Sequence, residues 1–126
     1  MSKYNLSNAE YELMEFFWEN NQEFSLAEIM DYCSNTLGRD LKKQTIHTFL
    51  RRLIDKGALQ AVRRGVRYYY SPTMSKEDFV SKWTREFLEK EFNGSLKHFI
   101  VSLTGGTQIS KEECQELQEL LDSLFS

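Results

Sequence analysis

The chain marks the starts of four helices with the same short motif. Each motif is a serine followed three positions later by Asp or Glu, at Ser7–Glu10, Ser25–Glu28, Ser75–Asp78 and Ser110–Glu113. In such a capping box the hydroxyl accepts a hydrogen bond from a backbone N–H that the helix leaves without a partner, while the acidic side chain reaches back to the cap. An apolar residue stands directly before each serine, and a second apolar residue stands five positions after the first. The two can pack together as a hydrophobic staple. A mainly α-helical fold is therefore predicted.

Three helices are expected in the first half of the chain, over residues 8–20, 26–37 and 42–56. Apolar residues recur at the spacing of a half-buried helix in the first range, at Tyr11, Leu13, Met14, Phe17 and Trp18. The third range shows the same spacing, at Ile46, Phe49, Leu50, Leu53 and Ile54.

A β-hairpin is expected after the third helix. Residues 59–62 and 67–70 are short extended segments on either side of Gly65, which suits a tight turn with positive φ, and Pro72 ends the second strand. Three helices followed by a hairpin are the order of a winged helix-turn-helix, in which the third helix enters a major groove and the hairpin lies beside it as a wing. Residues 1–73 are predicted to form this DNA-binding domain.

Helices alone are expected in residues 74–126. Three short helices are predicted there, over residues 75–92, 95–103 and from 111 onward, and they are rich in apolar side chains. Units this small have too little partner surface to bury so many aromatic residues, so burial against a second copy across a two-fold axis is expected. The alternative is that they fold back onto the winged domain. The predicted dimerisation residues are Phe79, Trp83, Phe87, Phe92, Leu96, Phe99, Ile100, Leu103, Leu117, Leu120, Leu121 and Leu124.

Positive charge is concentrated in one segment of an acidic chain. Residues 41–72 hold eight Lys and Arg and one acidic residue, Asp55, whereas the formal net charge of the whole chain is −3. The other 94 of the 126 residues therefore carry −10. A solvated helix face normally mixes charges of both signs, so this segregation favours DNA binding over simple solvation.

The third predicted helix presents polar side chains that can read DNA. At about 100° per residue, its apolar residues occupy one side and polar residues the other. Arg can contact guanine, Gln adenine and Thr thymine, and lysines at a helix start suit phosphate contact. The predicted contacts on this helix are Lys42, Lys43, Gln44, Thr45, His47, Thr48, Arg51 and Arg52.

The predicted wing adds three phosphate-binding arginines, Arg63, Arg64 and Arg67. By strand alternation Tyr69 points opposite to Tyr68 and Tyr70, so that one side packs on the core and the other can reach the DNA backbone. If six of the eight cations in the segment neutralise phosphates, a plot of the logarithm of the affinity against the logarithm of the salt concentration should have a slope of about −5.

Other chemistries have little support in the sequence. His47 and His98 lack carboxylates or thiols at metal-ligand spacing, which argues against a metal site. Cys33 and Cys114 form no disulfide framework and are expected to be reduced thiols packed as small apolar groups. Neither a catalytic set nor a Gly-rich phosphate loop is recognisable, so neither an enzyme nor a cofactor is expected. The absence of an apolar run near the roughly 20 residues that span a bilayer, and of a signal peptide, indicates a cytoplasmic protein.

Four segments carry a resemblance to a known family: LSNAEYELMEFFWE, QTIHTFLRRLIDKGAL, VRYYYSP and FLEKEFNGSLKHFIVSL. In that order they resemble the first helix, the recognition helix, the wing strand and the opening of the dimerisation helices of the penicillinase-repressor family, also called BlaI/MecI/CopY. The resemblance covers nearly the whole chain.

This resemblance implies a cytoplasmic homodimeric repressor that sits on a palindromic operator before resistance or homeostasis genes and releases it on a signal. By position it implies that bases are read by Gln44, Thr45, His47, Thr48 and Arg51. Phosphates would be held by Lys43, Arg52 and the wing arginines. Gln44 and His47 stand where the family often has Lys and Arg, a difference that concerns operator sequence rather than DNA binding itself.

Two features of the family concern the signal. Its copper-responsive branch carries C-x-C pairs near the C-terminus, where this chain has only Cys114, so copper sensing is not expected. Its β-lactam branch is cut within the dimerisation helices by a membrane sensor-protease. The corresponding bond here would be Ser102–Leu103, which makes it the candidate cleavage site.

The function expected is thus a dimeric transcriptional repressor that reads two operator half-sites, controlling genes of the β-lactam resistance type or related ones. The rival interpretation is a winged-helix adaptor in a larger complex, with little affinity for DNA and a protein partner on the C-terminal aromatic residues. A small-molecule pocket between the dimer helices is a further alternative.

Overall fold

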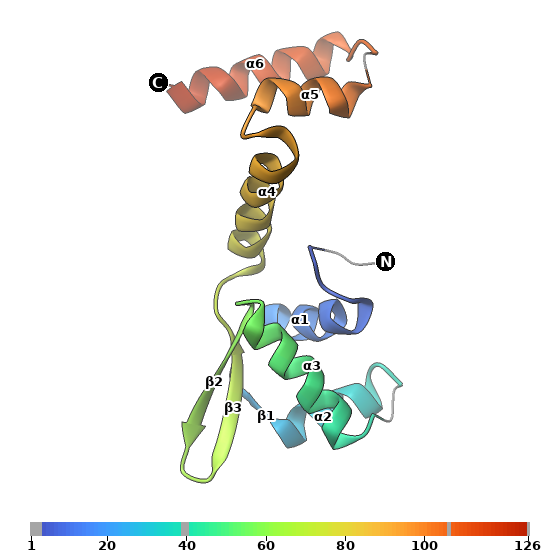
Figure 1. The fold of residues 1–126 in the computed structure, drawn as a ribbon, viewed down its shortest axis with the longest axis vertical. Coiled ribbons are helices and arrows are strands. Elements are labelled where there is room, and N and C mark those ends of the chain that lie inside the picture. The colour runs from blue at the N-terminus through green and yellow to red at the C-terminus, as the bar shows by residue number, and fades with distance from the viewer. Residues whose placement is uncertain (1–3, 39–40, 106, 126) are drawn as a thin grey trace. The chain divides into compact units, whose positions relative to one another are not determined.

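The helices and strands follow the order of a winged helix-turn-helix with further helices after it (Figure 1). The computed structural model describes residues 4–38, 41–105 and 107–125. Its helices are α1 (Asn8–Asn20), α2 (Leu26–Asn35), α3 (Lys43–Asp55), α4 (Lys76–Phe92), α5 (Leu96–Thr104) and α6 (Lys111–Phe125). Its strands are β1 (Phe24–Ser25), β2 (Leu59–Arg64) and β3 (Arg67–Pro72). The mainly helical winged fold predicted from the sequence is confirmed.

Two compact units make up the chain, Met1–Trp83 and Thr84–Ser126, and the division falls within α4. The predicted boundary between residues 73 and 74 lies in the segment that precedes α4. The first turns of α4 therefore belong to the same unit as the winged elements.

The predicted serine caps are present at the starts of α1, α2, α4 and α6. Ser7 Oγ accepts a hydrogen bond from the Glu10 N–H at 3.2 Å, and Glu10 Oε1 accepts one from the Ser7 N–H at 2.8 Å. The box of α2 is reciprocal in the same way. At α4 and α6 the serine hydroxyl accepts from the backbone N–H three residues later. Helix α5 has a serine cap too, Ser95, which the motif missed because a histidine stands where the acid would be.

The core of the first unit lies where α1, α2 and α3 meet the sheet. Its buried apolar residues are Leu6, Leu13, Met14, Phe16, Phe17, Ile29, Cys33, Ile46, Leu50, Leu53, Ala58, Leu59 and Tyr70. On α3 this leaves Ile46, Leu50 and Leu53 facing inward, as the spacing predicts. The opposite side of α3 is consequently free to face solvent.

Three details of the core differ from the sequence prediction. Ile54 was expected on the apolar face of α3, but its exposed fraction is 37 %, because it lies at the edge of the buried stripe. Phe16 was not expected to be buried, yet its ring stacks on that of Tyr32 with centroids 4.0 Å apart. Helix α2 ends at Asn35 rather than at Leu37.

The sheet has a third strand that the sequence pattern did not predict. Strand β1 is two residues long and pairs antiparallel with β3, Phe24 opposite Tyr70 and Ser25 opposite Tyr69. The sheet order is β1-β3-β2. Two residues are too few to show the alternation by which a strand is recognised, and β1 depends on the edge that β3 offers. Strands β2 and β3 each run two residues beyond their predicted ends.

Aromatic rings join the first half of α4 to α1 and to Tyr4, which precedes α1, within the first unit. The ring centroids of Phe79 and Trp18 are 5.4 Å apart, and those of Trp83 and Tyr4 are 5.3 Å apart. Phe79 and Trp83 were predicted to be dimerisation residues. In the structure they make ring contacts inside their own chain.

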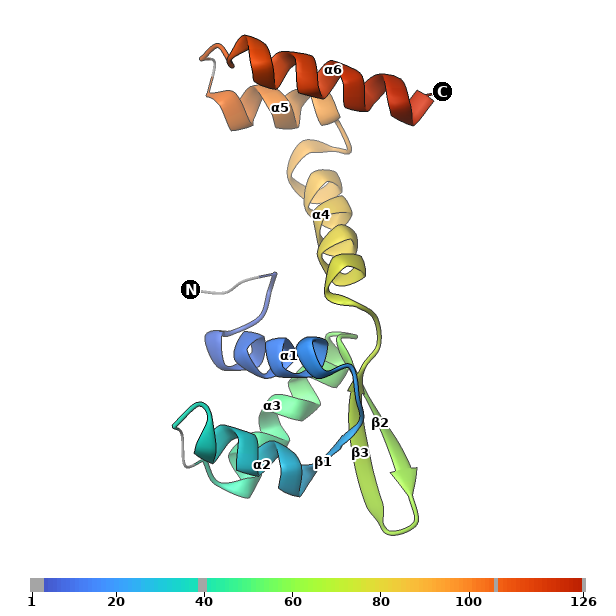
Figure 2. The same ribbon diagram turned by 180° about the vertical axis from the view of Figure 1, so that it is seen from behind.

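The second unit contains the end of α4 together with α5 and α6, and α5 and α6 run side by side (Figures 1 and 2). Phe92 links α4 to α5, with ring centroids 5.9 Å from Phe87 and 5.6 Å from Phe99. Among the described residues of this unit whose exposure is given, all are exposed or half-buried. Leu103 and Leu124 are 73 % and 71 % exposed. The unit thus leaves much of its apolar surface open within a single chain.

Within the described ranges, every helix falls short of the length and apolar character that crossing a bilayer requires.

A buried carboxylate ties the start of α1 to the end of α3. Glu10 is 2 % exposed, and its Oε1 accepts from Lys56 Nζ at 3.1 Å as well as from the Ser7 N–H. Lys56 Nζ also donates to the Asn5 carbonyl at 2.7 Å. Burial by itself would raise the pKa of Glu10, but the hydrogen bonds from Ser7 and Lys56 bring this pKa below its ordinary value of 4.5.

Replacing Lys56 should destabilise the fold in a pH-dependent manner. Lys56→Met leaves the Glu10 carboxylate without its cation, and we expect a loss of about 1–3 kcal/mol in the free energy of unfolding at pH 7. A carboxyl whose pKa is lowered by folding stabilises above its ordinary pKa, and this stabilisation is lost as the pH falls through the folded-state pKa. The difference between wild type and variant should therefore shrink below pH 4.5. Urea unfolding at several pH values measures both effects.

The matched control is Lys43→Met, which removes an exposed lysine from the other end of α3 and should change stability by less than about 0.5 kcal/mol. A Lys56→Met protein as stable as wild type at pH 7, or a difference that grows in acid, would contradict the role assigned to this contact.

Candidate nucleic-acid interface

The outward side of α3 carries the polar residues that the sequence singled out. Gln44, His47, Thr48, Arg51 and Arg52 are exposed, and Thr45 is half-buried. Thr48 Oγ1 donates to the Gln44 carbonyl at 3.0 Å. The structure therefore brings these predicted contacts together on one helix face. Because Ile46, Leu50 and Leu53 hold the other side in the core, the orientation of this face is fixed by packing.

The start of α3 differs from those of its neighbours. Lys42 stands at the cap position with extended backbone and makes no side-chain capping bond, whereas serines cap α1 and α2. The first backbone N–H groups of a helix carry partial positive charge, and here they lie next to the exposed Lys42 and Lys43. Backbone and side chains at this point together suit an anion such as a DNA phosphate.

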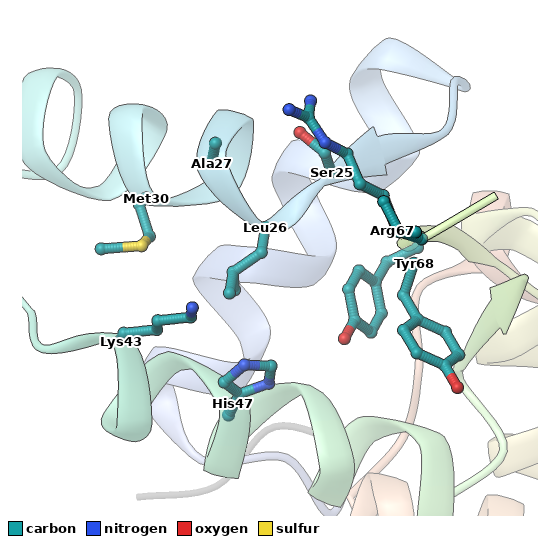
Figure 3. A pocket seen from close by; sticks show the side chains of 10 residues that line it. Ser25, Leu26, Ala27, Met30, Lys43, His47, Arg67 and Tyr68 are labelled. Atoms are coloured by element: carbon teal, nitrogen blue, oxygen red, sulfur yellow. The ribbon is translucent and has the colours of Figure 1, made fainter. Parts of the chain in front are cut away.

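A recess of about 450 Å³ lies between the start of α2, α3 and the wing (Figure 3). Lys43 and His47 project from α3 toward Leu26 of α2, and Tyr68 lies on the wing side (Figure 3). Arg67 also lines it. The described residues around this recess include cationic, aromatic and apolar side chains but no carboxylate. Such a lining accepts a polyanion without charge repulsion.

A second recess of about 480 Å³ lies further along α3 and is lined by residues that include Gln44, Thr48 and Arg51. His47 and Tyr70 line both recesses. His47 is thus a residue of the polar face of α3 that lines the recess between α3 and the wing. Its role as a contact residue remains a prediction. Within the described chain there is no group of three or more His, Cys, Asp or Glu that could hold a metal ion.

The wing is a hairpin with a two-residue turn. Arg64 pairs with Arg67, and Gly65 between them has φ of +65°, a conformation that favours glycine. Tyr70 is 7 % exposed and packs in the core, whereas Tyr68 on the same face is 52 % exposed nearer the turn. Alternation along β3 therefore does not alone decide which tyrosines are packed, because side chains on the same face become more exposed toward the turn.

The three wing arginines differ in their surroundings. All are exposed, and Arg63 Nε donates to the Gly65 carbonyl at 3.0 Å. Arg64 is engaged by a carboxylate that the sequence reasoning did not single out, that of Glu23. Its Nη2 lies 2.6 Å from Glu23 Oε1 and its Nε 2.9 Å from Oε2. Glu23 precedes Arg64 by 41 positions, so no local pattern could have paired them.

The residues predicted for dimerisation and cleavage lie at or near the surface. Ser102 and Leu103 are exposed in the last part of α5, and cleavage between them remains a prediction. Of the two thiols, Cys33 is buried as expected. The expectation that Cys114 is packed is wrong for the single chain, because Cys114 lies exposed on α6.

Known proteins match the chain over most of its length. The family model of the penicillinase repressor matches residues 6–123. A penicillinase repressor of Bacillus licheniformis is 31 % identical over 117 residues, which are 93 % of this chain and 89 % of that protein. A penicillinase repressor of Staphylococcus aureus is 23 % identical, covering 94 % and 92 %.

Among solved structures, the chain is similar to the solution structure of the DNA-binding domain of the repressor BlaI. The TM-score is 0.51 with 33 % sequence identity, over 62 % of this chain and 93 % of that domain. A family match that spans nearly the whole chain agrees with the resemblance carried by the helix and wing segments. The chain belongs to the penicillinase repressor family.

Proposed function

We propose that the protein is a DNA-binding transcriptional repressor that acts as a homodimer on a palindromic operator. The observation that carries this proposal is the polar face of α3, which is exposed, bounded by cations at its start and flanked by the wing arginines. The relatives named penicillinase repressor and the BlaI DNA-binding domain support it. Such a repressor would act in the cytoplasm, where operator DNA lies.

In this proposal α3 enters the major groove. Gln44, His47 and Arg51 would read base edges, and their exposure on the outward face of α3 supports this assignment. Thr45 and Thr48 add hydroxyl and methyl groups. Phosphate contacts would come from Lys42, Lys43 and Arg52 on α3 and from Arg63 and Arg67 on the wing.

Dimerisation is proposed to occur through the second unit. Those of its described residues whose exposure is given are exposed or half-buried in the single chain, and α6 carries an apolar stripe of Leu117, Leu120, Leu121 and Leu124, each 39 % to 71 % exposed. Burial of such a stripe against its own copy follows the isologous pairing of two-fold dimers. Two copies of α3 would then read two half-sites about one or two helical turns apart.

The regulated genes are proposed to be of the β-lactam resistance type, on the strength of the relatives' names. The signal that ends repression is proposed to act on the second unit, with cleavage at Ser102–Leu103 by a membrane sensor-protease as one route. This bond is exposed but lies in α5, so a protease would have to unwind the end of the helix to reach it.

Salt-dependent binding tests the proposal directly. A fluorescence-anisotropy titration with a duplex from upstream of the protein's own gene should show affinity that falls with salt, with a logarithmic slope of about −5 for each bound protomer. Absence of salt-sensitive binding would contradict the proposed function.

Arg51→Ala tests base reading. If Arg51 contacts a base, the variant should lose roughly 1–3 kcal/mol of binding free energy on the operator and discriminate less against one substituted base pair. Anisotropy titrations on the operator and on single-base variants measure both. Arg85→Ala, which removes an exposed arginine of α4, is the control and should bind like wild type. A uniform loss on every duplex would assign Arg51 to phosphate instead.

Leu121→Lys tests the dimer. A charge placed in an apolar interface is costly to bury, so the variant should shift toward the monomer and bind the two-half-site operator more weakly. Light scattering coupled to size-exclusion chromatography measures the mass. Gln115→Lys adds the same charge on another side of α6 and should remain dimeric. A wild-type protein that is already monomeric and has little affinity for DNA would favour the adaptor interpretation.

A further inference from the structure

The ion pair between Arg64 and Glu23 joins the wing to the segment that precedes β1. Arg64 is the last residue of β2, and its guanidinium meets both oxygens of Glu23, with N–O distances of 2.6 and 2.9 Å. Two parallel hydrogen bonds fix the plane of a guanidinium as well as its distance. The pair is open to solvent, with the side chains of Arg64 and Glu23 60 % and 36 % exposed.

The part of the wing nearest the turn has few other polar contacts with the body of the protein. We call residues 62–68 the distal wing. Strand β1 pairs only with Tyr69 and Tyr70, and residues 62–68 are all exposed. The side-chain hydrogen bond of Arg63 is local, to Gly65. Among the described residues, the polar side-chain contact that joins the distal wing to a distant part of the chain is thus the pair between Arg64 and Glu23, which precedes β1.

Both charges are stabilised by the contact. The hydrogen bond from Arg64 lowers the pKa of Glu23, and the same bond raises the pKa of Arg64. An exposed pair of this kind contributes little to the stability of the whole fold. The distal wing lies beyond the pairing with β1 and beyond the buried Leu59 and Tyr70 at the base of the hairpin. The effect of the ion pair on the distal wing is geometric, because it restricts the directions that this part of the hairpin can take.

We propose that Glu23 is a positioning residue for DNA binding, and that Arg64 acts through Glu23 to orient the distal wing instead of serving as a phosphate contact like Arg63 and Arg67. This inference rests on the proposed function. A wing that is already held beside α3 can meet the DNA backbone while α3 is in the groove. Without the ion pair, the wing would lose more conformational freedom when DNA binds, and this entropy loss would lower the affinity.

A positioning role for Glu23 and a purely electrostatic role predict opposite changes in DNA affinity when Glu23 is removed. Glu23 is a negative charge near the predicted DNA surface, so if charge alone mattered its removal would strengthen binding. A positioning role predicts weaker binding instead. The salt dependence of binding also distinguishes Arg64 from Arg67, because only a residue that contacts phosphate contributes to it.

The test uses the full-length protein and a fluorescent duplex of about 30 base pairs from upstream of its gene, in anisotropy titrations over a range of salt concentrations. Glu23→Ala and Arg64→Ala should each weaken binding by about two- to five-fold per protomer, with an unchanged salt slope. The double variant should match the single ones, because both remove the same contact. Arg67→Ala should lower the slope by about 0.9 per protomer.

Asp31→Ala is the matched control, because Asp31 is an exposed acid on α2 whose removal changes net charge equally. It should bind as tightly as wild type or slightly more tightly. Tighter or unchanged binding by Glu23→Ala would overturn the proposal. So would a lower salt slope in Arg64→Ala when Glu23→Ala has no effect.

A second readout does not depend on DNA. Backbone 15N order parameters of residues 62–68 in the free protein should fall in Glu23→Ala and Arg64→Ala but not in Asp31→Ala. Unchanged order parameters would overturn the positioning role even if affinity fell. If the wild type bound no duplex, the proposed function would fail, while the order parameters would still report whether the ion pair holds the wing.

Discussion

The buried carboxylate of Glu10 holds the architecture of the first unit in place. It accepts hydrogen bonds from the Ser7 N–H, which starts α1, and from Lys56, which follows the end of α3. One acidic side chain thus completes a helix cap and fixes the position of a second helix against the first. With that end of α3 held, and with Ile46, Leu50 and Leu53 in the core, the helix has one orientation and its polar face has one direction.

Two of the eight cations in residues 41–72 form ion pairs within the protein, and the other six remain available for DNA. Lys56 is held by Glu10, and Arg64 is held by Glu23. The six other cations of the segment are exposed on α3 or the wing: Lys42, Lys43, Arg51, Arg52, Arg63 and Arg67. The proposed DNA surface therefore uses less of the charge than the sequence contains. Under the proposals made above, Lys56 and Arg64 position the elements that carry that surface, and a count of charges alone would overstate the number of phosphate contacts.

Local patterns were sufficient to predict the helices, the hairpin and the polar face of α3, because caps, periodicity and a turn glycine are encoded over a few residues. Contacts between distant segments were not predictable in this way. Strand β1 is two residues long and exists through its pairing with β3. Glu10 and Lys56 are 46 positions apart, and Glu23 and Arg64 are 41 apart. Likewise, the place of Phe79 against Trp18 follows from packing rather than from its helical spacing.

The central claim is that α3 and the wing form one DNA-binding surface, and amide chemical shifts of the 15N-labelled protein test it most directly. On titration with the upstream duplex, the largest changes should occur at residues 42–52 of α3 and its cap and at the distal wing, with much smaller changes in α5 and α6. Changes confined to α5 and α6, or absent along α3 while the duplex binds, would contradict this account.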